Sequence, residues 1–275
     1  ASRFPCYDQW REKGEALADW PLSAHTLFWY TATCSIWGRI MPMTRTQRRI
    51  ILCLLVLILV LGTVYYSHLM TAYLSTRDEG GYLYAGWRIS LGEVPYRDFL
   101  TPQLPAFLYP GALLLKLSDS SVLVARLSMV ALTLAAALLL FMTVRRLFGD
   151  WIALLALVLV LVQRDFYWTA RFFRPEAPML FWTMLGMYLF VVGYPKRRRG
   201  LLRLAGAAFG ISMMSKLFGA LSIAGLALFI LVEGVRTRDW RDMVMTGLQV
   251  GIPFVLIIFS ISGLFMWMAP NFVAD

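Results

Sequence analysis

Two adjacent carboxylates, Asp78 and Glu79, follow the first long apolar run of the sequence. Acids beside a segment of membrane-spanning length are costly to keep in a dry environment. They therefore indicate either a solvated loop that marks the water side of a membrane, or a site that acts on a polar substrate at the membrane surface. In a site of that kind a carboxylate can accept the proton of a substrate hydroxyl group.

Four charged side chains farther along the chain are candidate site residues. Arg171 and Arg174 stand three residues apart and can share a helical face, where they could also stack on aromatic rings or contact lipid headgroups. Glu176 follows Pro175 at the head of an apolar segment, a position where a carboxylate also complements the helix dipole. Lys216 stands alone between two short apolar segments, so it either snorkels to the membrane surface or binds an anion.

Composition identifies the class of protein that must position these groups. Of the 275 residues, 59% are hydrophobic and only 15% are charged, against about 25% charged residues in ordinary soluble domains. A chain of this length cannot bury so much apolar surface in a soluble core, so we expect a multi-pass membrane protein. The net charge of +10 then serves membrane orientation and lipid contact, and no nucleic-acid partner is predicted.

We expect an all-α polytopic membrane protein with about seven transmembrane helices. The spans are predicted at 50–66, 122–144, 151–163, 177–193, 204–214, 218–232 and 243–265. If the N-terminal side is cytoplasmic, the basic clusters at 145–146, 196–199 and 236–241 all lie inside, as the positive-inside rule requires. The acid pair, the loop at 163–176 and Lys216 then lie outside.

The first outer loop, residues 67–121, is too long for a simple connector. Tyr82, the Ala85-Gly86 pair and Ile89 share one face of a helix, which favours a short helix in the plane of the membrane interface. Four prolines between Pro95 and Pro110 are then expected to break the chain before a second short apolar piece at 112–117. Such a loop either lines a cavity or only anchors the chain to the membrane.

Other classes of site receive no support. The two histidines are isolated, the three cysteines form no disulfide framework, and no phosphate-binding or nucleophile-elbow motif is present. No cofactor is indicated, while a divalent metal at the acids stays open. Residues 1–40 are interpreted as an upstream extension or an ordered interfacial segment, residues 41–275 as one transmembrane module, and the end at Asp275 as a truncation.

Several short patterns follow one another between Ile50 and Asp275. They are the acid pair, G-x-x-P-Y-R-D-F at 92–99, P-x-x-P-x-x-x-Y-P at 102–110, R-P-E at 174–176 and K-x-x-G at 216–219. Together they resemble the C-type glycosyltransferases that use polyprenyl-phosphate sugars, in particular bacterial aminoarabinose-transferase-like and protein O-mannosyltransferase-like proteins. The resemblance implies a shared module of seven spans, followed by further spans and an outer domain, and inversion at the sugar carbon. Many relatives carry aspartate where this chain has Glu176.

Such a transfer needs a base and a set of cations. We favour Asp78 as the base, with Glu79 supporting it or binding the acceptor or a metal, and we include Glu176 in the catalytic set. The candidates for stabilising the departing lipid phosphate are Lys216, Arg174 and Arg171.

Four side chains of the first outer loop are assigned to contact the substrate: Tyr82, Tyr96, Arg97 and Asp98. The expected partners are a polyprenyl-phosphate sugar donor, a lipid, glycan or protein acceptor and membrane lipids, with the active site outside the plasma membrane, which is the inner membrane in bacteria. The alternatives are a secondary transporter and a non-catalytic membrane assembly protein.

Overall fold

The computed structural model describes residues 44–68, 70 and 77–269. The chain divides within its first described helix into one unit that ends at Leu54 and a second that begins at Leu55. The predictions for residues 1–40 lie outside the described residues. The regular elements of the described residues are all helices, and one isolated bridge joins Pro95 and Phe99, so the expected all-α class is confirmed.

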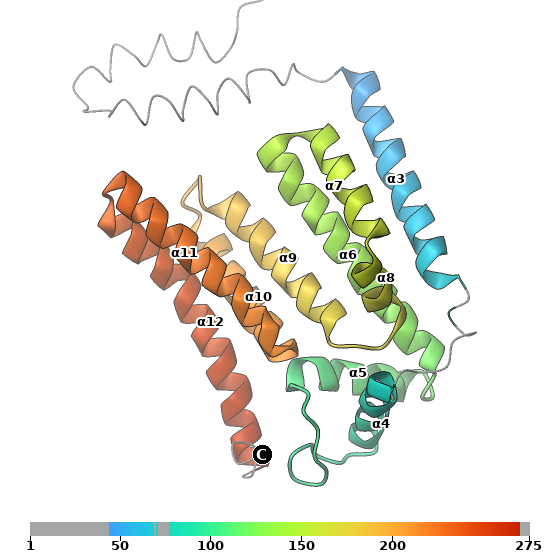
Figure 1. Cartoon of the computed structure of the whole chain (residues 1–275). Coiled ribbons are helices and arrows are strands. Elements are labelled where there is room, and N and C mark those ends of the chain that lie inside the picture. Colours follow the sequence, from blue (N-terminus) through green and yellow to red (C-terminus); the bar gives the residue numbers. More distant parts are fainter. Residues whose placement is uncertain (1–43, 69, 71–76, 270–275) are drawn as a thin grey trace, which may run out of the picture. The chain divides into compact units, whose positions relative to one another are not determined.

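Five helical segments are long and apolar enough to cross a membrane (Figure 1). They are α3 (Arg45–Ser67), α6 (Val122–Phe148), α9 (Glu176–Gly193), η1 with α11 (Leu217–Gly219 and Ala220–Thr237) and α12 (Trp240–Met268). A sixth is obtained if α7 (Asp150–Val162) and α8 (Arg164–Arg171), which meet at 66°, form one broken span. The protein is therefore a multi-pass membrane protein.

About seven spans were predicted, and among the described residues five or six segments meet these criteria of length and composition. The segment predicted at 204–214 is a helix, α10 (Arg199–Ser215), but it has 17 residues and begins with a basic side chain. It packs between α9 and α12. Gly206 allows this close approach, because a Cβ atom there would lie only 2.0 Å from the backbone oxygen of Val250 in α12.

The two ends of this helical bundle differ in their charges. Basic side chains occupy the last turn of α6, the connection that follows α9 and the last turn of α11. At the other end lie the starts of α6 and α9, the end of α10, and two shorter helices, α4 (Arg77–Ser90) and α5 (Pro105–Leu117) (Figure 1). The predicted site residues Asp78, Glu79, Glu176 and Lys216 thus lie at the same end of the bundle.

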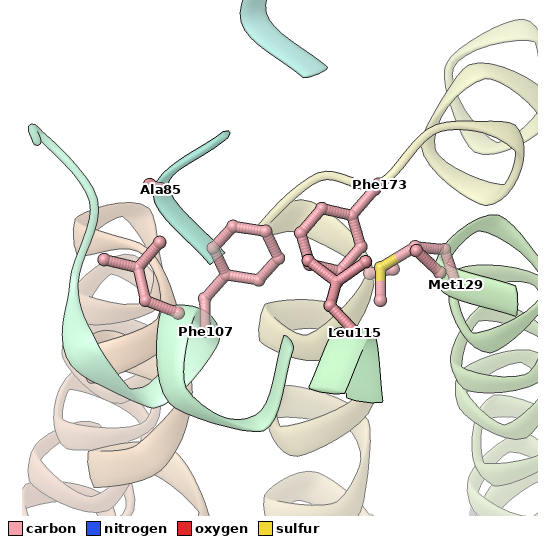
Figure 2. Packing of buried hydrophobic residues seen from close by; sticks show 8 residues of the cluster. Ala85, Phe107, Leu115, Met129 and Phe173 are labelled. Carbon is pink, nitrogen blue, oxygen red and sulfur yellow. The ribbon is translucent and has the colours of Figure 1, made fainter. Parts of the chain in front are cut away.

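Helices α4 and α5 form the predicted long loop and share a buried cluster with α6 and α9. Ala85 of α4, Phe107 and Leu115 of α5, Met129 of α6 and Phe173 meet there (Figure 2). Tyr82 and Ile89 pack on the same cluster, which confirms the face assigned to them in the sequence. Helix α4 ends at Ser90, where Gly92 takes a φ angle of 97° that favours glycine.

The prediction that prolines interrupt the chain up to residue 110 is wrong for two of them. Pro105 occupies the first turn of α5, where its missing N–H would have had no helical partner. Pro110 lies inside the same helix, which continues because Phe107, Leu108 and Leu115 are buried in the shared cluster. Tertiary packing here outweighs the loss of one backbone hydrogen bond.

Arg171 and Arg174 do not share a helical face, contrary to the sequence expectation. Helix α8 ends at Arg171, and Phe172 continues in extended conformation. The next residue, Phe173, is buried against Gly111, where even a Cβ atom would lie 2.4 Å from its ring. The ring of Phe173 therefore sets the path of the chain between α8 and α9.

Candidate functional site

Asp78 lies in the first turn of α4 and is one of the residues that line a groove. The groove has a volume of about 350 Å³ and is lined on one side by α4, including Asp78 and Tyr82, and on the other by residues 99–103. The side chain of Asp78 is 61% exposed, so a substrate in the groove can reach its carboxylate. Phe99 and Pro102 belong to the sequence patterns, but Leu100, Thr101 and Gln103 were not singled out, because they carry no charge.

Four side chains of alternating charge extend from Asp78 in a row. Nη2 of Arg174 lies 3.6 Å from Oδ2 of Asp78 and 3.3 Å from Oε1 of Glu176. Nζ of Lys216 lies 2.7 Å from the same Oε1 atom of Glu176. The charges of the row sum to zero, and its three members after Asp78 are partly buried. The fold thus brings together the predicted base and two of the three predicted phosphate ligands.

The ends of two helices position Glu176 and Lys216, the last two members of this row. Glu176 is the first residue of α9, where a negative charge complements the helix dipole. Lys216 follows the last residue of α10, where a positive charge is favoured for the same reason. The turn after Lys216 is tight, because a Cβ atom on Gly219 would lie 2.7 Å from Ser212.

Tyr82 lies between the groove and the row of charges. Its ring meets that of Phe107 edge-on at 5.7 Å. Burial raises the pKa of its phenol, and the negative charges of Asp78 and Glu176 raise it further, while Arg174 acts in the opposite direction. The hydroxyl of Tyr82 therefore stays protonated near neutral pH and can donate a hydrogen bond to a ligand in the groove.

Glu79 has surroundings quite different from those of its neighbour Asp78. It is fully buried and receives two hydrogen bonds from Arg126, of 2.9 Å from Nε and 2.7 Å from Nη2. The backbone N–H of Phe173 donates a third, of 2.8 Å. Arg126 also donates to the carbonyl oxygen of Met70 and lies 5.3 Å over the ring of Phe172. This contact joins α4, α6 and the connection between α8 and α9.

Arg126 was missed in the sequence, although a signal was present. It is an ionisable residue in the first turns of a predicted span, and such residues are rare and usually paired. Its partner could not be found from sequence, since 47 positions separate it from Glu79.

The other three residues assigned to the substrate loop are Tyr96, Arg97 and Asp98. They are not among the residues that line the groove, and their contacts hold the shape of the segment beside it. Arg97 and Asp98 form an ion pair of 2.8 Å. That contact and the N–H of Val94 lower the pKa of Asp98 to about 2. Tyr96 takes a φ angle of 67°, donates its hydroxyl proton to the carbonyl oxygen of Gln103 and packs on Phe265 of α12.

Arg171 is almost fully buried. Its Nη1 atom donates to the phenol of Tyr167, and its guanidinium group lies 4.7 Å over that ring. The aromatic alternative considered for this arginine is therefore present in the structure, and its role toward a phosphate stays a prediction. Within the described part of the chain, no group of three or more histidine, cysteine or acidic side chains is arranged to hold a metal ion.

Comparisons with known proteins agree with this fold. The model of the family described as dolichyl-phosphate-mannose-protein mannosyltransferase matches residues 101–265, which begin after Asp78. A similar solved structure is that of the S. cerevisiae protein O-mannosyltransferase Pmt1–Pmt2 complex bound to the sugar donor, with a TM-score of 0.59 and 15% identity. The match covers 86% of this chain and 35% of that one, so the chain spans about a third of that protein.

A search of curated proteins found no match. The family match covers more than half of the chain and confirms the resemblance drawn from the sequence patterns, and the helical fold agrees with it. The chain therefore belongs to the dolichyl-phosphate-mannose-protein mannosyltransferase family of membrane proteins.

Proposed function

We propose that this chain is the catalytic module of a membrane glycosyltransferase, which moves a sugar from a polyprenyl-phosphate donor to a hydroxyl group of a lipid, glycan or protein acceptor. The observation that carries the proposal is the exposed carboxylate of Asp78, which lines an open groove and begins the row that contains the partly buried cations Arg174 and Lys216. Membership of the mannosyltransferase family favours this function over a transporter or an assembly protein.

Asp78 acts as the general base in this proposal. The acceptor enters the groove, its hydroxyl oxygen attacks the anomeric carbon of the donor sugar, and its proton passes to the carboxylate of Asp78. The bond between that carbon and the phosphate oxygen breaks, and the oxygen leaves with the electron pair. Tyr82, which shares the groove, orients the acceptor through its protonated hydroxyl.

Lys216 and Arg174 stabilise the negative charge that develops on the departing phosphate. Their distances to Glu176 place both cations within reach of one anion, and Arg171 is a third candidate. Glu79 supports Asp78 from the next position of α4, because its contacts with Arg126 and Phe173 hold the first turn of that helix.

The activity can be tested in nanodiscs that contain the full chain and a radiolabelled polyprenyl-phosphate sugar. Polyprenyl-phosphate mannose is the first donor to use, because the family description names mannose. We expect label to move from the lipid to a hydroxyl acceptor in the wild type and not in Asp78→Asn. Absence of transfer or hydrolysis with a panel of such donors and acceptors would overturn the proposal.

We further infer that the site faces the outside of the plasma membrane, the inner membrane in bacteria, with the N-terminal side in the cytoplasm. The basic clusters at the opposite end of the bundle support this orientation. In a background without the native cysteines, Leu100→Cys should react with an impermeant thiol reagent in intact cells, and Leu147→Cys should not. Both side chains are well exposed in the structure, so the reverse pattern would invert the orientation.

A further inference from the structure

The two oxygen atoms of the Glu176 carboxylate differ in their contacts. Its Oε1 atom contacts both Lys216 and Arg174, at 2.7 and 3.3 Å. Its Oε2 atom is buried and has no hydrogen-bond partner in the described part of the chain, and the same is true of Nε of Arg174. Buried polar atoms are normally hydrogen-bonded, so this row of charges is not saturated by its own members.

We propose that Glu176 competes with the phosphate group of the lipid for Lys216 and Arg174, and thereby limits how long the lipid phosphate stays bound after transfer. The inference rests on the proposed function, in which these two cations bind that phosphate. It assigns Glu176 a role through its two cationic partners and no contact with the reacting atoms.

The charges of donor and product give the reason for such a competitor. The donor is a phosphate diester with a single negative charge. Transfer breaks the bond from the sugar to the phosphate oxygen and leaves a phosphate monoester, which carries about −1.5 to −2 charges near pH 7. Two cations that bind the donor would therefore bind the product more strongly and retard its release.

Glu176 reduces this difference, because its negative charge lies beside the same two cations and repels the more highly charged product more than it repels the donor. Its position as the first residue of α9 stabilises its negative charge independently of Lys216. Lys216, at the end of α10, can therefore change partner from Glu176 to a phosphate without leaving either helix end uncompensated.

Replacement of Glu176 by glutamine tests the inference, because it removes the competing charge and keeps the shape. The full chain in phosphatidylcholine nanodiscs would be titrated with farnesyl phosphate, a short polyprenyl phosphate, and its inhibition of sugar transfer would be measured. We expect Glu176→Gln to bind farnesyl phosphate about fivefold more tightly than the wild type, the equivalent of ~1 kcal/mol. The inhibition constant of farnesyl phosphate should fall by a larger factor than the KM for the donor.

Glu233→Gln is the matched control, since Glu233 pairs with Arg236 at the far end of α11. It should leave the affinity for farnesyl phosphate unchanged. If Glu176→Gln lowers the folded yield, Glu176→Asp serves instead, because its shorter carboxylate reaches Lys216 less well, and it too should bind the phosphate more tightly.

The possible failures are distinguishable. If the wild type transfers sugar and Lys216→Ala weakens phosphate binding, but neither Glu176 variant tightens it, this inference is wrong and the proposed function stands. A merely structural role of Glu176 would give unchanged or weaker binding of farnesyl phosphate. If the wild type neither transfers sugar nor binds farnesyl phosphate, the proposed function fails and this inference with it.

Discussion

Asp78 and Glu79 are neighbours in the sequence, yet the fold gives them opposite surroundings. Glu79 is fully buried, with a two-point contact to Arg126 and a backbone N–H on the same carboxylate. Asp78 is 61% exposed and contacts Arg174 at only 3.6 Å. The difference arises because successive side chains on a helix point about 100° apart, so one acid faces α6 and the other faces the groove.

The two ion-pair systems therefore serve different purposes. The Glu79–Arg126 pair has short contacts and is enclosed, and such a pair resists any change of partner. The row from Asp78 to Lys216 is partly exposed and leaves buried atoms without partners among the described residues, so it can accept a ligand. Four predictions test this difference.

The largest effect is expected for Asp78→Asn. If Asp78 is the base, turnover should fall by about 10²–10⁴-fold, while the melting temperature stays close to that of the wild type because the side chain is mostly exposed. The measurement is transfer of labelled sugar in nanodiscs, with thermal unfolding of the same preparation. Near-normal transfer by Asp78→Asn, together with an inactive but folded Glu79→Gln, would move the base by one residue.

The second effect is on stability and compares the same substitution in the two regions. Arg126→Gln should lower the free energy of unfolding by about 3–5 kcal/mol, because it leaves the buried carboxylate of Glu79 without its charged partner. Arg174→Gln, in the partly exposed row, should lower it by less than ~1 kcal/mol. Thermal or denaturant unfolding in detergent would measure both. Equal losses would mean that burial does not separate the two systems.

A smaller effect is expected for Lys216→Ala. It should weaken binding of the polyprenyl-phosphate donor by about 10- to 150-fold, since a hydrogen bond to a charged group contributes ~1.5–3 kcal/mol, and should affect the acceptor less. Lys216→Arg should keep part of the affinity, because the charge remains while its geometry changes. Donor titration and folded yield are measured together. Normal donor binding with reduced stability would make Lys216 only the structural partner of Glu176.

The smallest effect is expected for Asp98, which belongs to neither system. Its folded-state pKa of about 2 lies below the ordinary value of the group, so ionised Asp98 favours the folded state above about pH 4. That contribution is lost as the pH falls toward 2. Asp98→Asn should therefore remove a small part of the acid sensitivity of unfolding and leave stability near pH 7 almost unchanged, because the pair with Arg97 is largely exposed. A pH series of melting temperatures would show it, and a large loss at pH 7 would contradict it.

The sequence was sufficient to predict the class of the protein, the approximate positions of its long helices and the residues of the row. Membrane-length apolar runs and basic flanks are local properties of the chain, so α3, α6, α9 and α12 begin and end within a few residues of their predicted spans. The acids, Arg174 and Lys216 were found because isolated charges between apolar runs are costly unless they have a function or a partner.

Which of these charges meet depends on the tertiary structure. The pairing of Glu79 with Arg126, and that of Glu176 with Lys216 across 40 positions, depend on how α4, α6, α9 and α10 pack. It also decided that Pro110 lies inside a helix and that Arg171 and Arg174 lie on different elements. The physical reason is that a local pattern sets the direction of a side chain on its own helix, whereas burial and partner are set by residues remote in sequence.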